Sequence, residues 1–138
     1  MSGNESTGEA QLLSGFNGNP PAVLSLIKEF QVASDIALPD DYLEFVQKAN
    51  GSEGWIGDAY VMLWRVEELL EKNSAYRVTE HARGLLLFGS DGGGEAFAFD
   101  LRSGSGPIVS IPFVGMDIKS ATPIATTFRG FLESLSKS

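Results

Sequence analysis

The sequence predicts a single α+β domain in which an antiparallel sheet is flanked by helices at the N- and C-terminal ends. Its 138 residues, 43% hydrophobic and 20% charged, suit one globular domain with one core. Apolar residues recur at helical spacing near both ends, whereas short apolar runs alternate with glycine-rich turns in the middle. Consecutive runs joined by short turns predict a meander of about four to six strands.

The first 19 residues are expected to lie outside this domain. They are rich in Gly, Asn, Ser and Glu and offer only Leu12, Leu13 and Phe16 for burial. We therefore expect a flexible N-terminal arm over residues 1–19 and the folded domain over residues 20–138.

Helices are predicted on both sides of the sheet. One spans residues 20–33, and a second begins at Pro39 and ends at Asn50-Gly51, where both residues tolerate the left-handed conformation that closes a helix. A short third helix is predicted over residues 66–73. Thr122-Pro123 is expected to open the C-terminal helix.

The strands are predicted from short runs of apolar or alternating residues. Ser52 to Asp58 is expected to be a loop that carries Trp55. The glycine-rich segment Asp91-Gly92-Gly93-Gly94 is predicted to be the turn of a hairpin. Strands are expected over residues 60–64, 85–88, 95–101 and 108–113.

The charge balance favours a basic partner. Eighteen acidic residues against ten basic ones give a formal net charge of −8. Such a charge repels nucleic acid phosphates and anionic lipid headgroups, so we expect neither nucleic acid nor a membrane as partner. The alternative, that the charge only keeps the protein soluble, stays open.

The sequence favours a cytoplasmic location. No apolar run approaches the roughly 20 residues that cross a bilayer, and the N-terminus lacks the basic start and apolar stretch of a secretory signal. The absence of cysteine suits a reducing compartment.

The residue types that common enzymes need are scarce, so we predict no enzymatic activity, no cofactor and no metal. There is no cysteine, His81 is the only histidine, and no Gly-x-Ser-x-Gly elbow joins a strand to a helix. The segment Gly89 to Glu95 lacks the Gly-Lys-Ser/Thr of a phosphate-binding loop and precedes a strand. Its acids do not form the twelve-residue calcium-loop pattern.

The candidate functional surface is a protein-binding one. The segment from Asp35 to Asp58 is the most acidic of the chain, and it contains an aromatic residue, Trp55, among polar neighbours. Exposed aromatic residues beside acids are frequent anchors for Arg- or Lys-rich partners. The alternative, in which Trp55 packs into the core, stays open. The predicted partner-binding residues are the acids and the aromatic of the loops, Glu53, Trp55, Asp58, Asp91 and Glu95.

Four motifs in a fixed order resemble the SUKH superfamily, in particular the branch named for a fungal cell-wall assembly regulator. The resemblance covers roughly residues 22–135. The motifs are Leu-Pro-Asp-Asp-Tyr-Leu-Glu-Phe at 38–45, Asn-Gly at 50–51, Trp-Arg-Val-Glu-Glu-Leu at 64–69, and Phe-Gly-Ser-Asp-Gly-Gly-Gly-Glu-Ala-Phe-Ala-Phe-Asp at 88–100.

The resemblance implies an α+β fold and a non-enzymatic role in binding proteins. Most bacterial members of the superfamily are immunity proteins, which bind and neutralise a cognate toxin, often a nuclease. A nuclease needs a basic surface for its substrate, so an acidic inhibitor suits it. The alternative role is that of a regulatory or scaffold domain that binds a small ligand or a cellular protein.

Overall fold

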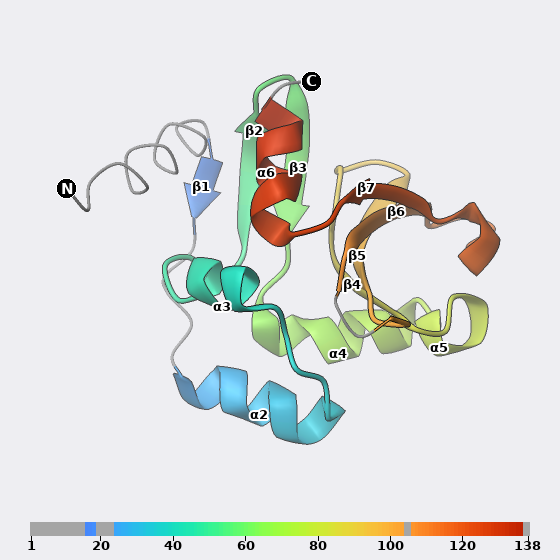
Figure 1. Cartoon of the computed structure of the whole chain (residues 1–138), viewed down its shortest axis with the longest axis horizontal. Coiled ribbons are helices and arrows are strands. Elements are labelled where there is room, and N and C mark those ends of the chain that lie inside the picture. The colour runs from blue at the N-terminus through green and yellow to red at the C-terminus, as the bar shows by residue number, and fades with distance from the viewer. Residues whose placement is uncertain (1–15, 19–23, 104–105, 137–138) are drawn as a thin grey trace.

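The computed structural model describes residues 16–18, 24–103 and 106–136. In these residues, a seven-stranded antiparallel sheet is combined with helices that precede and follow most of its strands (Figure 1). Each strand pairs with the next one along the chain, so the sheet is a simple meander. The predicted α+β class, the meander and the helices at both ends are confirmed.

The elements alternate between helical and extended segments. The helices are α2 (Leu24–Ser34), α3 (Asp40–Val46), α4 (Val66–Ala75), α5 (Val78–His81) and α6 (Phe128–Ser136), with a 3-10 turn η1 (Ile118–Ser120). The strands are β1 (Phe16–Gly18), β2 (Ser52–Ile56), β3 (Ala59–Leu63), β4 (Leu85–Ser90), β5 (Glu95–Asp100), β6 (Ile108–Pro112) and β7 (Thr122–Ala125).

The N-terminal segment contributes the short strand β1, which pairs with β2. This strand lies inside the segment expected to be an arm, and it adds one strand to the expected four to six. The rest of that expected arm, residues 1–15 and 19, lies outside the described residues.

Two predicted segments adopt a different structure. The loop expected from Ser52 to Asp58 is mostly β2, in which Ser52, Gly54 and Ile56 are buried and the residues between them are exposed. Because two of the three buried residues are a serine and a glycine, a search for alternating apolar residues does not find this strand.

The segment expected to open the C-terminal helix is the strand β7. β7 pairs with β6 alone, and such an edge position tolerates Pro123, which has no N–H to donate. α6 begins later, at Phe128, where the Thr127 hydroxyl accepts a hydrogen bond from Gly130 N (2.9 Å) and so caps the helix.

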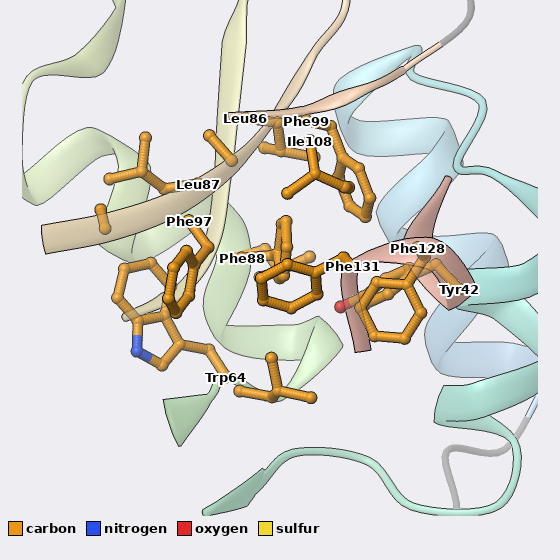
Figure 2. Close-up of a cluster of buried hydrophobic side chains, with 14 of the residues drawn as sticks. Tyr42, Trp64, Leu86, Leu87, Phe88, Phe97, Phe99, Ile108, Phe128 and Phe131 are labelled. Atoms are coloured by element: carbon orange, nitrogen blue, oxygen red, sulfur yellow. The ribbon is translucent and has the colours of Figure 1, made fainter. Parts of the chain in front are cut away.

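A closed aromatic cluster forms the centre of the core, where α3 and α6 meet β4 and β5 (Figure 2). Phe88 and Phe99 are stacked with ring centroids 4.4 Å apart, and the ring of Phe128 lies 5.7 Å from that of Phe88. The core aromatic cluster consists of rings that are at most 1% exposed, Tyr42, Phe88, Phe99, Phe128 and Phe131.

Tyr42 is the one residue of this cluster with a polar atom. Its hydroxyl is buried and has no hydrogen-bond partner among the described residues. Burial raises the pKa of Tyr42 well above its ordinary value of 10, because the phenolate cannot be solvated there. Tyr42 therefore remains a neutral core residue.

Three polar side chains join elements that are distant in the sequence. The carboxylate of Asp41 accepts hydrogen bonds from Tyr42 N and, across 88 residues, from Arg129 N in the first turn of α6, both at 2.9 Å. Asn50 accepts one from Val66 N (2.9 Å) at the start of α4. Both residues belong to the motifs at 38–45 and 50–51, so the motifs carry structural hydrogen bonds.

The third such residue, Asn73 on α4, completes the pairing of β4. β3 pairs with β4 at only two positions before the chain turns into α4. Beyond them, the Asn73 amide donates to Leu87 O (2.9 Å) and accepts from Leu87 N (2.8 Å), as a neighbouring strand would. This contact fixes α4 beside the sheet and sets the position of its exposed side.

Candidate functional site

The exposed face of the β2–β3 hairpin carries a pair of aromatic residues. Trp55 and Tyr60 are directly opposite each other in the register, with ring centroids 5.3 Å apart in an edge-to-face arrangement. Trp55 is 57% exposed, so it does not pack into the core. An exposed tryptophan held by a neighbouring ring is preorganised for contact with a partner.

Glu53 lies on the same face and is hydrogen-bonded within the chain. The hydroxyl of Tyr60 donates to Glu53 Oε2 at 2.5 Å. This hydrogen bond raises the pKa of Tyr60, because losing the proton would place a phenolate beside the carboxylate. The acid thus orients the Tyr60 ring that supports Trp55.

Two hollows lie on this side of the molecule and share three residues. The larger has a volume of about 760 Å³ and is formed by β2, β3 and the start of α4. The smaller, of about 410 Å³, lies between α4 and the glycine-rich β4–β5 turn. Both are lined by Met62, Trp64 and Lys72, so they form one continuous surface. We call the residues that line the two hollows the aromatic groove.

A second set of rings extends this groove toward β6. Trp64 and Tyr76 are nearly parallel, with centroids 6.1 Å apart, and Phe113 lies 4.7 Å from Tyr76. Lys72 Nζ lies 5.2 Å above the Trp64 ring, a cation–π arrangement. Tyr76 is 42% exposed, whereas Trp64 is 9% exposed.

The glycine-rich turn borders the smaller hollow and is a hairpin turn, as predicted. Asp91 Oδ1 accepts hydrogen bonds from Gly93 N (2.8 Å) and Glu95 N (3.2 Å). Gly92 has φ +81°, and a Cβ there would lie 2.9 Å from the Tyr60 ring. The turn therefore packs against the Trp55–Tyr60 pair. The Asp91 carboxylate also occupies the N–H groups of Gly93 and Glu95, which a bound phosphate would need.

The structure brings together only some of the predicted site residues. Glu53 and Trp55 line the groove. Asp91 and Glu95 flank the turn that borders it without lining either hollow, and Asp58 is exposed in the β2–β3 turn. Their binding roles stay predictions.

Sequence reasoning did not select the other aromatic residues of the groove. Tyr60, Met62 and Trp64 alternate along β3 and the residue after it, a spacing that places them on one face of the sheet. This signal was present in the sequence. Tyr76 and Phe113 join them only through the fold, because they lie on opposite sides of the β4–β5 hairpin in the sequence.

Other kinds of site find little support in the described part of the chain. There, no three His, Cys, Asp or Glu side chains come close enough to hold a metal ion. His81 is exposed at the end of α5. None of the helices in the described ranges has the length and apolar character needed to cross a membrane.

Comparison with known proteins bears on the family of the chain. No curated protein matches the chain. The family model of the SMI1/KNR4 family (SUKH-1) matches residues 21–134, a span that begins before α2, ends within α6 and includes all four motifs. The predicted superfamily is therefore confirmed, and the chain belongs to the SMI1/KNR4 family (SUKH-1).

Proposed function

We propose that the protein is a non-enzymatic immunity protein that binds and neutralises a cognate bacterial toxin in the cytoplasm. Family membership is consistent with immunity or regulatory roles and with binding to another protein. The observation that carries the proposal is the aromatic groove, in which Trp55 and Tyr76 are substantially exposed. Partly exposed tryptophan and tyrosine are the residues that most often dominate the affinity of protein interfaces.

The charge of the chain supports a basic toxin, for example a nuclease. A net charge of −8 accelerates association with a positively charged surface and opposes binding to nucleic acid or anionic membranes. In this proposal Trp55 is the central anchor and Glu53 orients its neighbour Tyr60. Asp58, Asp91 and Glu95 supply negative charge at the rim, where charge affects the association rate more than the lifetime of the complex.

Co-expression tests this proposal. The protein is produced together with a candidate toxin domain, such as the C-terminal domain of any large secreted protein encoded beside it, and cell survival and co-purification are scored. Survival with a stable complex is expected for the wild type. Trp55→Ala should reduce protection, whereas Val32→Ala, a matched change at an 86% exposed position on α2, should not. Cell death despite good expression of the wild type would exclude immunity to that toxin.

The smaller hollow supports a second candidate, a regulatory or scaffold domain that binds a small ligand. It lies beside the glycine-rich turn and is walled by Trp64, Tyr76 and Phe113. A thermal-shift screen with nucleotides, sugars and divalent ions tests it. Stabilisation that Tyr76→Ala removes would favour this candidate, and no stabilisation by any compound would count against it.

A further inference from the structure

We propose that the aromatic groove accepts an acidic side chain of the partner, an Asp or Glu beside an apolar residue, and that Lys72 selects it. This inference rests on the proposed function, since it specifies what enters the groove of a protein-binding domain. It differs from the expectation that acids of this chain contact a basic surface directly, an expectation that stays a prediction for Glu53.

The carboxylates in the groove are already engaged within the chain. Glu53 accepts the hydrogen bond from the Tyr60 hydroxyl. Glu68 accepts one from Arg65 N at 3.0 Å, at the start of α4. These internal hydrogen bonds hold the two carboxylates in place and help to position the Trp55–Tyr60 pair and the start of α4.

The groove also contains two cations, Arg65 and Lys72. Among the described residues, neither Arg65 nor Lys72 forms an ion pair. Lys72 is half-buried and lies over Trp64, and it borders both hollows. The Lys72 ammonium can donate to an incoming carboxylate while it stays over the Trp64 ring, and such a charge-assisted hydrogen bond is stronger than a neutral one.

The groove as a whole offers a carboxylate and an apolar group matching contacts. A carboxylate at Lys72 places the neighbouring apolar side chain against the rings of Trp64 and Tyr76. On a basic toxin, such an acid would be an exception among the residues that contact this protein. Pairing this acid with Lys72 fixes the register of the complex. A partner with a basic residue at the same position would be rejected, because its positive charge and that of Lys72 would repel each other.

The two tryptophans of the chain make this inference testable without a known partner. Both Trp55 and Trp64 line the larger hollow, and the chain has no other tryptophan, so intrinsic tryptophan emission reports on the groove. The probes are three blocked tripeptides that carry Phe between two Glu, two Gln or two Lys residues. None of them absorbs where tryptophan is excited.

Titration at low salt should show the acidic peptide binding about fivefold more tightly than the Gln peptide, as expected for one half-buried ion pair. Lys72→Met should remove that preference and Lys72→Arg should retain it. Lys28→Met, which removes a cation on the exposed side of α2, is the matched control and should leave it unchanged. Salt should reduce the preference.

Several results would overturn the inference. These are equal binding of the acidic and Gln peptides, tighter binding of the Lys peptide, a preference that survives in Lys72→Met, or no emission change with any peptide up to about 5 mM. Inorganic phosphate acting as strongly as the acidic peptide would instead indicate a small-anion site. The co-expression assay is independent, so survival combined with a failed titration would exclude this inference and leave the proposed function standing.

Discussion

The protein contains two aromatic groups with opposite exposure. The core aromatic cluster is closed by α3 and α6 and is at most 1% exposed, whereas Trp55 and Tyr76 of the aromatic groove are 57% and 42% exposed. Both use edge-to-face and stacked pairs at similar distances, for example 5.0 Å for Tyr42–Phe99 and 5.3 Å for Trp55–Tyr60. Ring packing alone therefore does not distinguish a structural cluster from a binding surface.

The chemistry of the rings does distinguish them. The core aromatic cluster is built mainly from phenylalanine, whose side chain has no polar atom to satisfy, and its one hydroxyl, on Tyr42, has no hydrogen-bond partner within the described part of the chain. The rings of the groove are mainly those of tryptophan and tyrosine, whose polar atoms can face water or a partner. Within the groove, the Tyr60 hydroxyl has Glu53 as its acceptor. We infer that the closed cluster determines stability and the open one determines binding.

The largest expected effect is on the closed cluster. Phe88→Ala should lower the free energy of unfolding by about 3–5 kcal/mol, because it leaves a cavity among the rings of Phe99, Phe128 and Phe131. Urea denaturation followed by circular dichroism measures this. Phe88→Leu should cost clearly less, and a loss below about 1 kcal/mol for Phe88→Ala would contradict the closed packing.

A smaller loss of stability is expected for Asp41, a residue of the motif at 38–45 that joins α3 and α6 over the core aromatic cluster. Asp41→Ala removes the acceptor for Arg129 N and Tyr42 N and should cost about 1–2 kcal/mol. Asp41→Asn keeps an oxygen acceptor and should retain much of the stability, as measured by the same denaturation. Asp40→Ala, at the exposed neighbouring position, is the matched control. Equal effects of Asp40→Ala and Asp41→Ala on stability would argue against a structural role for the hydrogen bonds that Asp41 accepts.

The open cluster should show the reverse pattern. Trp55→Ala should change the free energy of unfolding by only about 0.5 kcal/mol or less, since the side chain is exposed, yet it should weaken toxin binding at least tenfold. Calorimetric titration with the partner from co-expression measures the affinity. A variant that unfolds readily, or one that binds as tightly as the wild type, would contradict the division between the two clusters.

The closed cluster was largely predictable from the sequence, and the open one was not. Tyr42, Phe45 and Phe128 recur with other apolar residues at helical spacing, and burial on one helix face leaves this periodic signal in the sequence. The groove combines residues from β2, β3, α4 and the segment after β6. No local pattern links those segments, and of the residues that line the groove the sequence analysis selected only Glu53 and Trp55.

Turns and edges explain the incorrect structural predictions. β2 contains a serine and a glycine at buried positions, so its alternation involves few apolar residues. β7 contains Pro123, which indicates a helix start in isolation and is equally suited to an edge strand. In both cases the deciding factor is the neighbouring strand, which a single-segment analysis does not include.

The smallest expected effect concerns an ion pair outside both clusters. We expect this pair to contribute little to stability, which would sharpen the comparison between the two clusters. Arg102 donates to both carboxylate oxygens of Asp100 at 2.9 and 2.7 Å, and these bonds hold the pKa of Asp100 below its ordinary 3.8. The pKa of Asp100 is thus lower in the folded state than in the unfolded chain. The pair therefore stabilises the fold at pH values above 3.8 and loses its contribution as the pH falls through the folded pKa. Asp100→Asn should therefore be slightly less stable than the wild type near neutral pH, and the difference should shrink as the pH falls below 3.8. Thermal unfolding of both proteins across this range measures the difference, and a gap that widens as the pH falls would contradict the pairing.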